Sequence, residues 1–244
     1  MKNSIILILL CLYTANVFAN KLTVVTEQLS FFQYQNNGNI EGYAVDIINE
    51  LSKLADEDID IQIVPWARAF YIASNQPNVL IFSIAYTQSR DDSFIWAGEI
   101  FDEPLYFWKL KNEDASLNYS IKEDDTYAAS RSSVGLEYLK KHKTKNINIV
   151  NTQKQSLLLL YSKRVDFIIS GERSIEYRAK KLNLDSSKLI RLSSELKMQQ
   201  KLYFAFSLGT DPNIIEKYKK AYKTLVHTKK LSKIRKKWDV ENSP

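Results

Sequence analysis

The residues from Val79 to Ala85 form an almost wholly apolar run that is rich in branched side chains. Such a run favours a strand covered on both faces, as in a parallel sheet flanked by helices. Ligands of open sheets gather at the carboxyl ends of the strands, and Arg90 follows that end of this run. A guanidinium group there can hold a carboxylate through two parallel hydrogen bonds. For a lone arginine, a surface ion pair would be the better explanation.

Strand and helix patterns alternate on both sides of this run. Short branched runs predict strands at residues 22–26 and 59–64, and apolar residues spaced by three and four predict a helix over 44–54. Strand, helix, strand, helix, strand implies parallel pairing with right-handed crossovers. The same rhythm restarts near residue 126, and a late strand at 201–207 can return to the first unit. We therefore expect an α/β fold of two units, with the second inserted into the first.

The first 19 residues have the pattern of a secretory signal peptide. Lys2 gives a charged start, Ile5 to Tyr13 is too short an apolar run to span a bilayer, and Ala19 precedes the expected cleavage point. Cleavage would remove Cys11, the one cysteine, so we expect no disulfide in the mature chain. No later run approaches a membrane span. The sequence predicts a periplasmic monomer that does not span the membrane after signal cleavage.

Five short motifs occur in order along the chain: an aromatic turn with Gly-aromatic-x-Val-Asp (30–46), Ser83–Arg90 with Phe94 and Pro104 downstream, Arg131–Ser133, Lys163–Asp166 and Leu231–Trp238. Each motif alone is a weak signal, but their order and spacing behind a signal peptide are specific. Over nearly the whole mature length, the chain resembles the bacterial extracellular solute-binding proteins of family 3, the amino-acid type of periplasmic binding protein.

This resemblance implies the two-lobed periplasmic binding protein fold of type II, in which each lobe is a mostly parallel sheet flanked by helices. Two hinge strands would join the lobes. Lobe 1 would comprise residues 20–108 and 201–244, with lobe 2 inserted at 109–200 and the signal peptide at 1–19. The implied function is capture of a small polar ligand by hinge closure, for delivery to an ABC transporter permease.

The resemblance also implies a carboxylate site between the lobes. Arg90 would bind the ligand carboxylate, and Ser83 and the backbone of Ala85 would contribute hydrogen bonds from the same strand end. Ser132 and Ser133 would complete the site from lobe 2, because hydroxyls and free amides at a helix start can hold an anion.

Three further residues are candidates for this site. Phe32 and Trp66 would form apolar walls. Gly171 stands where the family usually has an aspartate for an amino acid's ammonium group, and Glu172 beside it could take that role or could be a solvated glutamate. The ligand is therefore an amino acid, another small carboxylate or a related polar metabolite.

Two other functions stay open. One is a dehydratase-like enzyme of the same fold with Glu172 as its acid, and the other is a ligand-sensing partner of a membrane receptor. His142 and His227 lie in lysine-rich segments, and neither metal-ligand spacing nor a Ser, His and Asp arrangement stands out. We expect a binding protein without catalytic residues, metal or cofactor. The basic C-terminal helix predicts a solvated face and no nucleic-acid partner.

Overall fold

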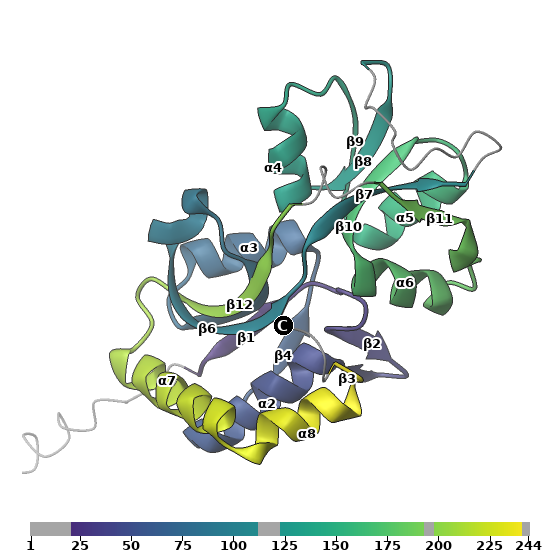
Figure 1. The fold of residues 1–244 in the computed structure, drawn as a ribbon. Coiled ribbons are helices and arrows are strands. Elements are labelled where there is room, and N and C mark those ends of the chain that lie inside the picture. The colour runs from purple at the N-terminus through teal and green to yellow at the C-terminus, as the bar shows by residue number, and fades with distance from the viewer. Residues whose placement is uncertain (1–20, 112–122, 193–197, 241–244) are drawn as a thin grey trace, which may run out of the picture.

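The computed structural model describes residues 21–111, 123–192 and 198–240, so the predicted signal peptide lies outside the described residues. Two five-stranded sheets, each flanked by helices, form two lobes (Figure 1). The strand order is β4-β1-β5-β12-β6 in the first lobe and β11-β7-β10-β8-β9 in the second. Both sheets mix parallel and antiparallel pairs. The predicted two-lobed α/β fold is confirmed.

The first lobe is built around its central strand. Its elements are β1 (Thr23–Thr26), β2 (Tyr34–Asn36), β3 (Asn39–Glu41), α2 (Tyr43–Ala55), β4 (Ile61–Ile63), α3 (Trp66–Asn75), β5 (Val79–Ala85), η1 (Gln88–Ser93), β6 (Phe94–Asp102), β12 (Lys201–Ser207), α7 (Pro212–His227) and α8 (Lys229–Lys237). Every residue of β5 is buried, as its apolar run predicts. The late strand β12 pairs with β5 and β6, so this part of the chain returns to the first sheet.

The second lobe contains β7 (Leu105–Leu110), β8 (Thr126–Ser130), α4 (Val134–Lys141), β9 (Asn146–Val150), α5 (Gln153–Tyr161), β10 (Phe167–Gly171), α6 (Glu172–Lys181), η2 (Ser186–Lys188) and β11 (Leu189–Arg191). Helices α4 and α5 begin with side-chain caps that satisfy free amides of the first turn. Strand β7 pairs with β10 and β11, so the predicted lobe boundary at residue 108 falls within a strand of the second sheet.

Two adjacent segments join the lobes. Strand β6 ends at Asp102 in the first sheet, and β7 begins at Leu105 in the second. The returning segment lies beside this crossing, because Leu105 N donates to Met198 O at 2.8 Å and Glu103 N donates to Gln200 O at 2.9 Å. Paired crossing segments of this kind can act as a hinge, since a few residues at the ends of elements absorb the rotation.

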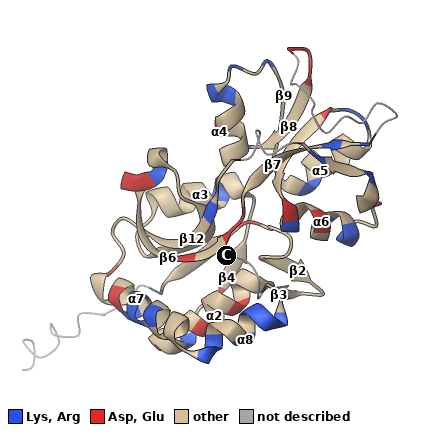
Figure 2. Ribbon diagram, viewed as in Figure 1, with Lys and Arg blue, Asp and Glu red and all other residues tan. Residues whose placement is uncertain are grey.

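The lysine-rich C-terminal helices α7 and α8 pack against α2 within the first lobe. Figure 2 shows their basic residues together with acidic residues of α2. Lys217 Nζ lies 2.6 Å from Glu57 Oε1, and Lys237 Nζ lies 2.7 Å from Asp46 Oδ2. The cationic run is therefore in part paired within the lobe. In the described ranges, none of the helices is both long and apolar enough to cross a bilayer.

Candidate functional site

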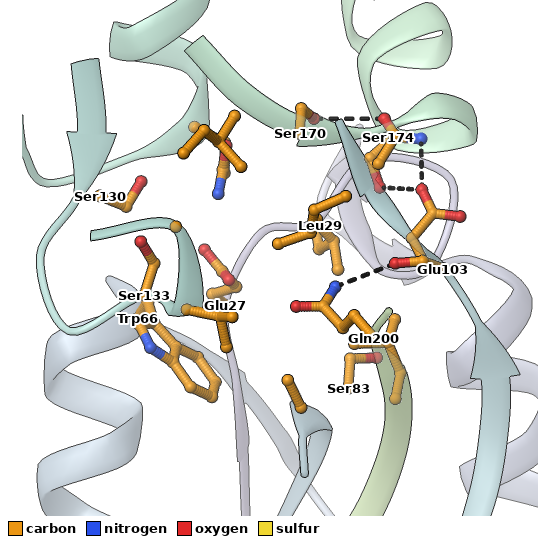
Figure 3. Close-up of a pocket in the computed structure, with 18 of the residues that line it drawn as sticks. Glu27, Leu29, Trp66, Ser83, Glu103, Ser130, Ser133, Ser170, Ser174 and Gln200 are labelled. Atoms are coloured by element: carbon orange, nitrogen blue, oxygen red, sulfur yellow. Dashed lines mark hydrogen bonds between the residues drawn. The ribbon is translucent and has the colours of Figure 1, made fainter. Parts of the chain in front are cut away.

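A cavity of about 60 Å³ lies between the lobes and is lined by residues from both sheets and from the crossing segments (Figure 3). Several lining residues sit at or just beyond the carboxyl ends of β1, β5, β8 and β10, where ligands of open sheets bind. The volume is well below the roughly 300 Å³ of a pocket for a drug-sized ligand. In this conformation the cavity has room for a small molecule or group.

Arg90 lines this cavity and joins the two lobes. Its side chain is 3% exposed, and Nη1 donates to the carbonyl oxygen of Ala85 at 3.2 Å. Nη2 donates to Ser132 O at 3.0 Å and to Glu137 Oε1 at 2.6 Å, both in the second lobe. The guanidinium carbon lies 5.2 Å from the ring centroid of Phe70, within cation–π range. The structure thus places Arg90 at the contact between the lobes.

Trp66 and the two serines before α4 form the wall next to Arg90. Trp66 Nε1 donates to Ser132 O at 2.8 Å, so one carbonyl oxygen receives hydrogen bonds from two residues of the first lobe. Ser132 has φ of 59°, and its side chain is not among the groups that line the cavity. Ser133 does line it, while its Oγ accepts a hydrogen bond from Leu136 N at 3.2 Å. The hydroxyl proton of Ser133 stays available to a ligand.

Ser83 and Ala85 line the cavity from the end of β5. A chain of buried hydrogen bonds fixes Ser83: its Oγ donates to Gln33 Oε1 at 2.7 Å, and Gln33 Nε2 donates to Thr26 Oγ1 at 2.9 Å. Ser83 also has φ of 55°. Its hydroxyl proton is therefore committed within the protein, and an oxygen lone pair is what it offers to a ligand.

The structure does not bring Phe32 or Glu172 to the cavity. Phe32 is fully buried, and its ring packs against that of Phe101 at 5.2 Å in the core of the first lobe. Glu172 begins α6 with its side chain 47% exposed, and its Oε1 pairs with Arg191 Nη1 at 2.8 Å. Neither an amine contact nor acid catalysis in the cavity is open to Glu172 in this arrangement.

The structure reveals two carboxylates in the cavity wall that the sequence reasoning missed. Glu27 follows β1, and no described residue donates a hydrogen bond to its carboxylate. Burial raises the pKa of Glu27 to about 7, although Arg178 and Arg90 favour its charged form. The strand-end rule that selected Arg90 could also have selected Glu27.

Glu103 is the second missed carboxylate and is 3% exposed. Its Oε1 accepts hydrogen bonds from Ser174 N at 3.1 Å and from Ser174 Oγ at 3.0 Å, in the first turn of α6. Burial raises the pKa of Glu103 to about 7, against the lowering effect of Ser174, Arg173 and Arg178. No sequence pattern marks this residue, because its position depends on where the crossing segment meets the second lobe.

Solved structures of binding proteins share this fold. ArtJ, the arginine-, lysine-, histidine-binding protein of Geobacillus stearothermophilus, has a TM-score of 0.78 at 20% identity, covering 92% of this chain and 96% of its own. A histidine kinase sensor domain similar to periplasmic binding proteins has a TM-score of 0.75 at 16% identity, covering 91% and 97%. A structure from work on glutathione import through GshT and the cystine ABC importer TcyBC of Streptococcus mutans has a TM-score of 0.73 at 20% identity, covering 92% and 97%.

These likenesses establish the two-lobed periplasmic binding protein fold. No curated protein sequence matches the chain. The sequence profile of the bacterial extracellular solute-binding proteins, family 3, matches residues 22–241, almost the whole chain beyond the predicted signal peptide. This chain therefore belongs to the bacterial extracellular solute-binding proteins of family 3.

Proposed function

We propose that this protein captures a small polar solute between its lobes and releases it unchanged to a membrane importer. The observation that carries the proposal is the cavity whose wall combines polar groups of both lobes, with Arg90 reaching across to Ser132 and Glu137. A ligand that contacts both lobes favours the closed state over the open one, because an open form makes only half of those contacts.

The ligand in this proposal carries a carboxylate that binds Arg90. In the present state, Glu137 Oε1 lies 2.6 Å from Nη2 of Arg90, so a carboxylate already occupies one side of the guanidinium. The side chain of Glu137 is 44% exposed and can turn into water at little cost. A ligand carboxylate would take its place, with the Ser133 hydroxyl as a further donor.

A thermal-shift screen of amino acids, oligopeptides, organic acids and amines tests this function, since a ligand that binds only the native state raises Tm. Arg90→Ala should weaken each carboxylate-bearing hit by about 100-fold, because a charged, bidentate hydrogen-bond pair is lost. Glu172→Gln is the matched control and should bind as the wild type does, because Glu172 lies outside the cavity. Equal carboxylate binding by Arg90→Ala would remove Arg90 from the site.

The periplasm and an importer complete the proposal. Cleavage after Ala19 would leave a mature chain that starts at Asn20, and N-terminal sequencing of the exported protein checks this. The importer role is supported by the family match and by the structural likeness to a protein studied in glutathione import. Deleting the gene should abolish uptake of the solute found in the screen. Intact uptake together with loss of a transcriptional response would instead indicate a sensor.

A further inference from the structure

We infer that Glu103 supplies the carboxylate that binds a positively charged nitrogen of the ligand in this cavity. The inference rests on the proposed function and adds the chemical class of the second ligand group, an ammonium or a guanidinium. It starts from a place where the wall lacks a side chain, Gly171, at the end of β10.

Gly171 leaves room for the carboxylate of Glu103. A Cβ atom built on Gly171 would lie 2.0 Å from Glu103 Oε1 and 2.4 Å from Glu103 Cδ. The backbone of Gly171 has φ of −71° and ψ of 154°, which any residue can adopt, so conformational freedom does not explain the glycine. The carboxylate of Glu103 thus occupies the volume into which a side chain at position 171 would project.

The carboxylate of Glu103 keeps acceptor capacity for a ligand. Both hydrogen bonds from Ser174 reach Oε1, and within the described ranges Oε2 receives none. The charges of Arg173 and Arg178 favour the ionised form of Glu103. They offset its burial only in part, because the pKa is still raised to about 7, and a ligand cation hydrogen-bonded to Oε2 would offset it further.

Two further unpartnered groups line the same cavity. The Glu27 carboxylate accepts no hydrogen bond from any described residue. Ser130 is 2% exposed, and its buried Oγ has no hydrogen-bond partner in the described chain. A buried hydroxyl without a partner costs stability, so Ser130 favours a polar group of the ligand beside it. Figure 3 shows Ser130, Glu27 and Glu103 around the cavity.

The charge balance of the wall favours a cation over a second anion. The charged lining residues are Glu27, Glu103 and Arg90. Glu137 neutralises Arg90 in the present state, which leaves two carboxylates in the cavity wall and one further positive charge, Arg178, that acts on both. A ligand carboxylate that displaced Glu137 would use the positive charge of Arg90. The negative charge of Glu27 and Glu103 would then still favour a cationic group on the ligand.

The screen above tests this inference when its hits are measured against the variant Glu103→Gln. We expect the tightest hits to contain a cationic nitrogen, and Glu103→Gln to weaken them at least about tenfold, since a charged hydrogen bond is lost. Carboxylic acids that lack a nitrogen should lose little. Glu172→Gln is again the control, because it removes a neighbouring carboxylate outside the cavity.

Moving the carboxylate from residue 103 to residue 171 separates an effect on ligand binding from an effect on folding. Gly171→Ala should weaken the same hits as Glu103→Gln does, because its Cβ would displace the Glu103 carboxylate. Glu103→Ala combined with Gly171→Asp should recover at least part of the affinity lost in Glu103→Ala alone, because the Cβ of residue 171 projects to the same place. A merely structural role of Glu103 predicts no such recovery.

The outcomes separate this inference from the proposed function. Hits confined to carboxylates or neutral solutes without a cationic nitrogen would overturn the inference and leave solute capture standing. Undiminished binding of amines or amino acids by Glu103→Gln would do the same. A wild-type protein whose Tm responds to none of the solutes would overturn both.

Discussion

The two ends of the cavity hold charge in opposite ways. At one end, Arg90 projects from the segment after β5 and pairs across the lobes with Glu137, a half-exposed carboxylate that can move into water. At the other end, Glu103 is buried in the crossing segment and is held by the first turn of α6. The positive end is thus neutralised by a movable group, whereas the charges of Arg173 and Arg178 offset the burial of the negative end only in part. We interpret Arg90 as a site where a ligand carboxylate replaces Glu137. We interpret Glu103 as a site whose carboxylate is already in position for a ligand.

The largest expected loss of ligand affinity comes from removing the charges of Arg90 and Glu103 together. The double variant Arg90→Ala, Glu103→Gln should weaken a zwitterionic hit by about 1000-fold, because losses at separate sites add as free energies. Isothermal titration of the two single variants and the double variant measures this. A double variant no weaker than the worse single variant would show that the two ends do not bind separate ligand groups.

The buried end should also set the pH dependence of stability. The pKa of Glu103 rises from 4.5 to about 7 on folding, so the folded protein binds more protons between these values. Its free energy of unfolding should therefore fall as pH rises through this window, by about 3 kcal/mol at most for this group. Glu27 acts in the same direction, since its pKa is also raised to about 7. Urea unfolding of ligand-free protein at pH 5 and pH 8 should show a smaller drop in Glu103→Gln than in the wild type. An unchanged drop would mean that Glu103 is not the titrating group.

The contact between the lobes should weaken when Trp66 loses its hydrogen bond to Ser132. Trp66→Phe removes the 2.8 Å bond from Nε1, worth about 1 kcal/mol, and should weaken ligand binding roughly fivefold. Trp96→Phe is the matched control, because Trp96 Nε1 donates to Asp91 O within the first lobe. Equal losses in the two variants would indicate a general packing effect and not a contribution to closure.

The smallest effect should come from Glu137. Glu137→Gln removes a carboxylate that competes with the ligand for Arg90, so carboxylate-bearing hits should bind up to about fivefold tighter. Titration at low and high salt measures this gain, which should shrink as salt screens the ion pair. Weaker binding by Glu137→Gln would mean that Glu137 orients the guanidinium and is not displaced by the ligand.

Local patterns explain which expectations the structure confirms. The apolar run of β5 favoured a buried strand, and the spaced apolar residues of α2 pack that helix against the sheet. The start of α7 also follows a local pattern, since Asp211 caps the helix and Pro212 opens it. Such features depend only on residues that are close in the sequence. Because ligands of open sheets bind at the carboxyl ends of strands, locating β5 was enough to predict Arg90 as a site residue.

Other site residues depended on contacts that no local pattern contains. Ser132 contributes its carbonyl oxygen where its hydroxyl was expected, because its backbone adopts a positive φ. Phe32 turns into the core because aromatic rings around it provide a better packed environment than the cavity wall. Whether an aromatic or polar residue near a strand end faces the core or a cavity is decided by packing around it.

The sequence by itself determined the order of strands and helices, the family, and the arginine at a strand end, because each follows from local periodicity or from motifs in a fixed order. Only the tertiary structure decided that Glu137 meets Arg90 and that Glu103 fills the space beside Gly171. Both contacts join residues far apart in the chain. They exist because the two crossing segments hold the lobes together, and that placement is a property of the whole packed molecule.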